Sequence, residues 1–232
     1  MRKISLCITN FNRTALLFES YKNVVDDERI SEIIISDDAS DIDLFNEVKL
    51  EIEKHPKIKL YRNLINQDCY YNKYTAVSLA TNEWVILLDS DNVINKSYID
   101  CLFEIKKWDN DTSYMPSWAM PLFDYRAYNG LRFTKENIAS YIDKHMVSTC
   151  LNCANYFVNR EEYMSAFDPN VNPHTADSIF INYNLLNNGN AIEIVPDLVY
   201  EHRVHNGSHY QNNHHKTGNL YDEILNKIRL LK

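Results

Sequence analysis

The chain has 232 residues, 45% of them hydrophobic and 24% charged, with a formal net charge of −8 at pH 7, and these values are typical of one globular domain with a full core. An acidic chain without a basic stripe is not expected to bind nucleic acid. No apolar run approaches the roughly 18 residues that cross a membrane, and Met1 leads into a strand-like run rather than a secretory signal, so we expect a cytoplasmic protein, with a peripheral membrane contact left open.

The first half of the chain alternates short β-branched apolar runs with longer amphipathic stretches. Strands are predicted at residues 4–9, 32–36, 58–61 and 85–88, and helices at residues 15–25, 44–54 and 74–80. This alternation predicts an α/β fold with a mostly parallel central sheet and helices on both faces. Ligands of such sheets bind beyond the carboxyl ends of the strands. The residues there are polar after every strand: Asn10 to Arg13, Asp37 and Asp38, Asn63, and Asp89 with Asp91.

The second half has a more mixed pattern. An aromatic segment at residues 113–128 contains Pro116 and Pro121, each of which would break a continuous helix. Further elements are predicted as a strand at 155–158, a helix at 175–186, and strands at 191–195 and 198–205. Residues 218–232 form a predicted helix that we expect to dock on the core. Its apolar side chains at helical spacing are Leu220, Ile224, Ile228 and Leu231.

The segment Val-Ile-Leu-Leu-Asp-Ser-Asp-Asn at residues 85–92 delivers two carboxylates, Asp89 and Asp91, to the end of a buried strand. Ionised carboxylates beside an apolar run are costly to desolvate unless they are paired, hydrogen-bonded or bound to a metal. Oxygen ligands favour Mg²⁺ or Mn²⁺ over zinc. The two carboxylates are therefore predicted to hold a divalent cation and a phosphate, with a solvated acidic turn as the alternative.

Glycines and cysteines exclude several classes of protein. The four glycines, at 130, 189, 207 and 218, form neither a dinucleotide-binding loop nor a phosphate-binding P-loop, which argues against a dehydrogenase or a P-loop kinase. The five cysteines are odd in number and irregularly spaced, as expected for reduced thiols. The lone pair Cys150-x-x-Cys153 has no second pair to complete a zinc site, so we assign it no role.

Four segments, at residues 3–13, 33–41, 72–80 and 83–92, resemble the successive motifs of glycosyltransferase family 2 in order and approximate spacing. The resemblance extends over residues 3–210 and implies a single GT-A domain over residues 1–232. It implies a nucleotide-binding half (1–108), an acceptor-binding half (109–210), and a C-terminal loop and helix (211–232). The implied reaction moves a sugar from a nucleotide diphosphate sugar, by family habit a UDP-sugar, to a hydroxyl of a glycan, lipid-linked or protein-linked acceptor. Enzymes of this family invert the configuration at the anomeric carbon. The cofactor that the resemblance implies is Mn²⁺ or Mg²⁺.

Carried over by position, the resemblance implies a set of donor-binding residues in the first half. Asp38 matches the carboxylate that accepts the base N–H, whereas Asp41 better suits a cap of the following helix. Lys73 stands where the family usually has an arginine and is assigned to the base or the phosphates. Asp91 would ligate the cation, with Asp89 also reaching the donor ribose or sugar. The implied donor contacts are Thr9, Phe11, Arg13, Asp38, Lys73, Asp89, Ser90 and His205.

Two segments of the second half complete the resemblance. Residues 174–180 resemble the family's Glu-Asp segment and make Asp177 the matching general base, although Ala176 replaces the customary glutamate. Inverting transfer needs such a base within hydrogen-bond reach of the acceptor hydroxyl. Residues 199–209 resemble the C-terminal histidine motif, in which His202 matches a further metal ligand and His205 faces the phosphates.

The aromatic segment is the predicted acceptor surface, with Trp118 and Tyr125 as platforms for a sugar ring, although plain core packing is the alternative for any single ring. Two other classes of function remain open. A phosphatase of the haloacid dehalogenase type would use Asp89 as nucleophile and Asp91 as its partner, but that motif normally opens its domain, and here three strand–helix units precede it. A non-catalytic module that binds a nucleotide sugar or carbohydrate is the other alternative.

Overall fold

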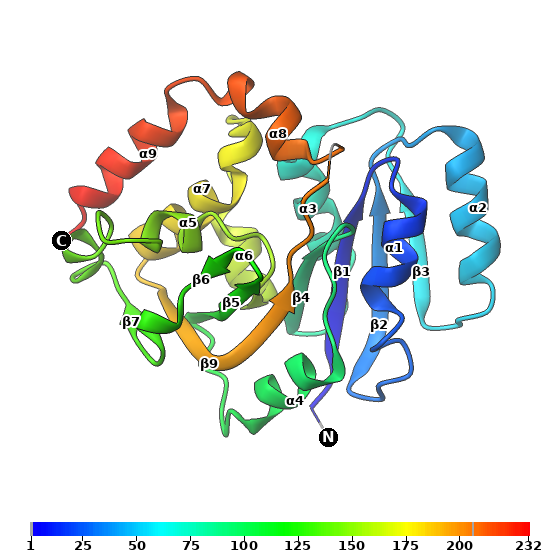
Figure 1. Cartoon of the computed structure of the whole chain (residues 1–232), viewed down its shortest axis with the longest axis horizontal. Helices are drawn as coiled ribbons and strands as arrows, with labels where there is room; N and C mark the ends of the chain where they lie inside the picture. Colours follow the sequence, from blue (N-terminus) through cyan, green and yellow to red (C-terminus); the bar gives the residue numbers. More distant parts are fainter. Residues whose placement is uncertain (1, 206) are drawn as a thin grey trace.

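A computed structural model describes residues 2–205 and 207–232. Within these residues the strands form one nine-stranded sheet in the order β3-β2-β1-β4-β8-β5-β9-β7, with β6 paired to β5 (Figure 1). The sheet brings both halves of the chain into a single α/β domain, because β4 of the first half pairs with β8 of the second.

The first half forms the parallel part of the sheet. Its strands are β1 (Ile4–Asn10), β2 (Ile30–Asp37), β3 (Ile58–Arg62) and β4 (Trp84–Asp89), and they pair in parallel. All residues of β1 are buried, as expected for a central strand covered on both faces. The connecting helices are α1 (Thr14–Tyr21), α2 (Ile42–Ile52) and α3 (Asp68–Ser78). All seven predicted elements of this half are present, with shifted ends, and α3 begins six residues before the predicted start.

The second half adds antiparallel and mixed pairing. Its strands are β5 (Thr112–Met120), β6 (Phe123–Asp124), β7 (Arg132–Phe133), β8 (Phe157–Asn159) and β9 (Ala191–Glu201). The prediction of two strands at 191–195 and 198–205 is wrong, because β9 is one strand paired in parallel with β5. Pro116 of β5 pairs with Val195 of β9, and Trp118, two residues further along β5, pairs with Val199, four residues further along β9. The intervening residues bulge, with Asp197 at a φ of 61°, and this bulge interrupts the apolar pattern without ending the strand.

The remaining helices follow β4 along the chain. They are α4 (Lys96–Glu104), α5 (Val147–Leu151), α6 (Arg160–Ala166), α7 (Asp177–Asn187), α8 (His209–Asn213) and α9 (Leu220–Arg229), with 3-10 turns η1 (Arg126–Tyr128), η2 (Ile138–Ser140), η3 (His174–Ala176) and η4 (His214–Thr217). Helices α4, α5, α6 and α8 are absent from the predicted elements, as are strands β5, β6 and β7. Asn159 accepts the backbone N–H groups of Glu161 and Glu162, so an N-cap signal for α6 was present in the sequence.

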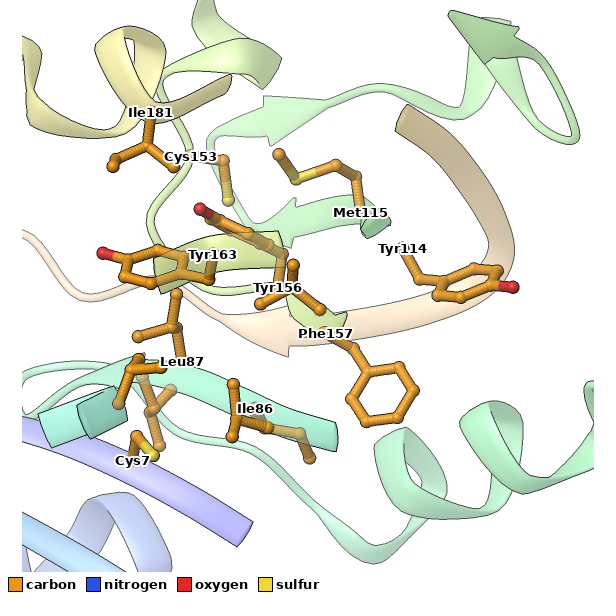
Figure 2. Packing of buried hydrophobic residues seen from close by; sticks show 14 of the residues in the cluster. Cys7, Ile86, Leu87, Tyr114, Met115, Cys153, Tyr156, Phe157, Tyr163 and Ile181 are labelled. Atoms are coloured by element: carbon orange, nitrogen blue, oxygen red, sulfur yellow. The ribbon is translucent and has the colours of Figure 1, made fainter. Parts of the chain in front are cut away.

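One buried core joins the two halves. Figure 2 shows Tyr156 and Tyr163 among the side chains that fill the space between Leu87 of β4 and Ile181 of α7. The C-terminal helix α9 packs against α7, with Ile224 and Ile228 fully buried, so the predicted docking on the core is confirmed. None of the described helices has the length and apolar character needed to cross a bilayer.

Candidate active site

The candidate site lies where β1, β2 and β4 end. Thr9 of β1 and Asp89 of β4 are paired across the sheet, and the Thr9 hydroxyl donates to Asp89 Oδ1 at 3.2 Å. The N–H of Ser90 donates to the Thr9 carbonyl at 3.1 Å. Ser90 itself is fully buried, and its hydroxyl has no hydrogen-bond partner among the residues that the structure describes. The parallel register thus brings the first and fourth strand ends into direct contact.

Lys73 links the end of β4 to the start of α7. Its ammonium lies 2.6 Å from Asp177 Oδ2 and 3.4 Å from Asp89 Oδ1, and only 6% of the residue is exposed. Burial alone would lower the pKa of Lys73, but the charges of Asp177 and Asp89 outweigh it and raise that pKa well above its usual range. Asp177, the predicted general base, and Asp89, the first carboxylate of the Asp-Ser-Asp motif, therefore both contact the buried ammonium of Lys73.

The positive charges of Lys73 and Arg13 hold Asp89 in its ionised form. Burial raises the pKa of its carboxyl, but the nearby charges of Lys73 and Arg13 act more strongly together and leave it below its ordinary value. Its backbone N–H donates to the side-chain oxygen of Asn155 at 2.8 Å. Asn155, just before β8, was not among the predicted site residues, because only the pairing of β8 with β4 brings it to this position.

Asp91 contacts two side chains from distant parts of the chain. Its Oδ2 lies 2.9 Å from Nη1 of Arg13 and 3.2 Å from Nε2 of His205. Arg13 also donates to the carbonyl of Gly207 at 2.8 Å, so the segment after β9 lies against the loop after β1. Arg203 was not predicted as a site residue, yet its guanidinium donates to the backbone carbonyl of Asp91.

His202 and Asp91 are two side chains whose chemistry suits a divalent cation. Burial lowers the pKa of His202, against the opposing charges of Asp91 and Asp89, and the neutral imidazole is the form that binds metals. Its buried Nδ1 has no hydrogen-bond partner in residues 2–205 and 207–232. In those same residues no three His, Cys, Asp or Glu side chains are already gathered as a metal site. A carboxylate and an unpartnered neutral imidazole nitrogen are donors that Mn²⁺ accepts.

The predicted base-binding residues lie at the ends of β1 and β2. Asp38 is buried, and its Oδ1 accepts from Asn63 Nδ2 at 2.8 Å and from the backbone N–H of Gln67 at 2.9 Å. Burial raises the pKa of Asp38. Phe11 is 44% exposed and offers an open aromatic face. Asp41 occupies the N-cap position of α2 but makes no capping hydrogen bond with its side chain.

The two predicted acceptor residues differ in position. Trp118 on β5 is half-buried, and the Arg126 guanidinium lies 4.1 Å from the centre of its ring. Its indole N–H is buried without a hydrogen-bond partner in the described part of the chain. Tyr125 is only 1% exposed and belongs to the core, and burial raises its pKa. The prediction of a sugar platform at Tyr125 is not supported, because its ring presents no face to solvent.

Two surface hollows lie at the opposite end of the sheet from these residues. One is lined by Glu32 and Lys59, and the other by Lys3 and His55. Neither contains a predicted site residue, and both are lined by residues near the amino ends of the parallel strands. The chemistry of the side chains therefore identifies the candidate site.

Known proteins share this architecture. The crystal structure of S. aureus TarS 1–349 in complex with UDP-GlcNAc matches with a TM-score of 0.70 and 14% identity, over 96% of this chain and 66% of that chain. A mannosyltransferase, PcManGT from Pyrobaculum calidifontis in complex with GDP-Man and Mn²⁺, matches with a TM-score of 0.68 and 15% identity, over 99% and 70%. GalNAc-T7 with UDP, GalNAc and Mn²⁺ matches with a TM-score of 0.66 and 16% identity, over 89% and 44%.

These similarities confirm the predicted GT-A fold. The chain spans less than two thirds of TarS 1–349, from 59% to 66% depending on the structure compared. No curated protein matches the chain by sequence. The model of the family described as glycosyl transferase family 2 matches residues 5–139, which is more than half of the chain. The chain therefore belongs to glycosyl transferase family 2.

Proposed function

We propose that the protein is a metal-dependent, inverting glycosyltransferase that moves a sugar from a nucleoside diphosphate sugar, with a UDP-sugar as the first candidate, to a hydroxyl of a carbohydrate-containing acceptor. Membership of glycosyl transferase family 2 supports glycosyl transfer. Similar folds have been solved with UDP, UDP-GlcNAc, or GDP-Man and Mn²⁺, which supports the nucleotide-sugar donor and the divalent ion. In this proposal residues 1–108 bind the nucleotide, residues 109–210 bind the acceptor, and residues 211–232 form a C-terminal loop and helix.

The observation that carries the proposal is the buried contact of Lys73 with both Asp89 and Asp177. Asp177 comes from a helix 88 positions further along the chain than Asp89, yet one ammonium group touches both carboxylates. A base for inverting transfer must lie close to the donor sugar, on the face opposite the leaving diphosphate. The shared lysine provides this proximity between the proposed base and the proposed donor site.

In the proposed reaction, Asp177 accepts the proton of the acceptor hydroxyl. The hydroxyl oxygen forms a bond to the anomeric carbon while the bond from that carbon to the diphosphate oxygen breaks, and its electron pair leaves with the nucleoside diphosphate. Asp91 and His202 would hold a divalent ion, whose chemistry is to act as a Lewis acid on the diphosphate. Arg13 and His205, which contact Asp91, are the further groups suited to the growing negative charge.

Donor recognition in this proposal depends on Asp38 and Phe11. The buried Asp38 carboxylate would accept the N–H of the base, in competition with its present partners Asn63 and Gln67. The exposed ring of Phe11 would lie against the base or ribose. Trp118 is the remaining candidate for the acceptor, with one face of its ring next to Arg126.

The substitution Asp177→Asn tests the proposal. It should lower sugar transfer by about 10²- to 10⁴-fold, the usual contribution of a general base, while nucleoside diphosphate binding with Mn²⁺ stays within about twofold of wild type. Donors are screened in a panel of UDP- and GDP-sugars that includes UDP-GlcNAc and GDP-Man, and binding is measured by thermal shift. Asp222→Asn is the matched control, because Asp222 is also an acid in the first turn of a helix but lies on α9. Full activity of Asp177→Asn would overturn the proposal.

A further inference from the structure

Asp68 and His174 form a close contact between the starts of two helices. Asp68 is the first residue of α3, which carries Lys73, and His174 opens the 3-10 turn that leads directly into α7 and Asp177. Oδ2 of Asp68 lies 2.7 Å from Nδ1 of His174. The pair thus joins the two elements whose side chains form the buried Lys73–Asp177 contact.

Both residues have backbone conformations that non-glycine residues rarely adopt. The φ angle is 74° at Asp68 and 51° at His174. Such left-handed conformations are strained, and they persist only where surrounding contacts determine them. Residues of this kind cluster at functional sites. Two of them in direct contact, at the start of α3 and just before α7, indicate a specific geometric requirement at this place.

Other contacts hold the same two segments together. Cys69 Sγ lies 3.2 Å from the carbonyl oxygen of His174, and the Tyr71 hydroxyl donates to the carbonyl of Pro169 at 3.0 Å. Asn172 accepts the backbone N–H of His174 at 3.0 Å, which shapes the turn. The contacts that His174 makes with Asp68 and Cys69 lie closer to Asp177 along the chain than the contact of Tyr71 with Pro169.

We propose that Asp68 and His174 are positioning residues, which set the start of α7 against α3 so that Asp177 meets Lys73 beside Asp89. The inference rests on the proposed role of Asp177 as general base. Neither residue needs to touch the substrate, because the effect passes through the backbone of residues 174–177 and of the first turns of α3. Catalytic geometry is sensitive to such placement, since a displacement of about 1 Å can cost about 10²-fold in rate.

The first test compares crystal structures of His174→Asn and Tyr71→Phe with that of the wild-type protein. Asparagine tolerates the left-handed conformation better than most residues, so His174→Asn shortens the side chain without adding backbone strain. The Lys73–Asp177 distance should lengthen beyond hydrogen-bond range in His174→Asn and stay near 2.6 Å in Tyr71→Phe. An unchanged distance in His174→Asn overturns the inference, with or without a known substrate.

The second test measures turnover of the donor identified in the panel above, as release of nucleoside diphosphate. His174→Asn should lower kcat by about 10- to 100-fold with the donor KM within about twofold, because only placement of the base is lost. Asp68→Asn keeps a carbonyl oxygen for His174 and a residue suited to a positive φ, so its kcat should stay within about fivefold of wild type. Tyr71→Phe should match wild type.

These outcomes separate the two proposals. If Asp177→Asn remains active, the proposed function fails, and the crystal structures still decide whether the Asp68–His174 pair sets the Lys73–Asp177 contact. If Asp177→Asn is inactive but His174→Asn behaves like Tyr71→Phe, the positioning role is overturned and the proposed base stands. If kcat falls in His174→Asn but not in Asp68→Asn, the positioning role is supported.

Discussion

Arg13 and Asp91 form an ion pair, with 2.9 Å between a guanidinium nitrogen and a carboxylate oxygen. Arg13 follows β1 and Asp91 follows β4, so the pair bridges two neighbouring strand ends. In the proposed function this carboxylate is also the metal ligand. A guanidinium and a divalent cation would then compete for the same oxygen, because both are attracted to its negative charge.

The substitution Arg13→Gln should therefore strengthen the binding of Mn²⁺ alone, in the absence of nucleotide. A partly exposed ion pair contributes up to about 1 kcal/mol, so the expected change is about a fivefold lower Kd, measured by electron paramagnetic resonance titration. Arg229→Gln is the control, because Arg229 pairs with Asp143 and lies on the C-terminal helix α9. Weaker Mn²⁺ binding by Arg13→Gln would contradict the proposed competition.

Replacement of Lys73 by methionine should destabilise the fold. The change leaves Asp89 and Asp177 buried without the cation between them, and breaking a buried ion pair in this way typically costs 3–5 kcal/mol. Urea denaturation at pH 7 measures the free energy of unfolding. The double variant Lys73→Met/Asp177→Asn should recover part of the loss, because it removes one of the two unpaired charges. If Lys73→Met lowers the free energy of unfolding by less than about 1 kcal/mol, the contacts of Lys73 contribute no more than a surface ion pair, and the prediction is wrong.

Glu32 on β2 should make the stability of the fold depend on pH at the acid end. Burial raises the pKa of its carboxyl, but hydrogen bonds from Lys59, Thr81 and Ser5 outweigh burial and lower it from 4.5 to about 2. Because the folded state has the lower pKa, the stabilisation is fully present above about pH 4.5 and is lost as the pH falls towards about 2.

The Glu32→Gln variant tests this dependence. Its free energy of unfolding should lie below that of wild type by about 1–3 kcal/mol at pH 7, the cost of disturbing a buried hydrogen-bonded group, and the difference should shrink as the pH falls from 4.5 to 3. Glu83→Gln is the control, because Glu83 is exposed. A difference between wild type and Glu32→Gln that stays constant with pH would show that the carboxylate charge is not the source.

Local patterns in the chain were enough to predict the parallel half of the sheet. The runs at β1, β2, β3 and β4 alternate with amphipathic helices, and this periodicity is a property of neighbouring residues. The same rule located the polar residues at the carboxyl ends of these strands, where Thr9 and Asp89 do meet. Family membership is confirmed as well, because the ordered motifs are linear features of the sequence.

Pairing between distant residues could be decided only by the folded chain. The contact of Lys73 with the base or the phosphates stays a prediction. Its place between Asp89 and Asp177 could not be read from the sequence, because the packing of α3 and the start of α7 determines which groups come within reach. Tyr125 was predicted to be an exposed platform and is buried, since an aromatic residue carries the same local signal in a core and on a surface. Strand order, register and burial arise from contacts far apart in the chain, and local periodicity does not specify them.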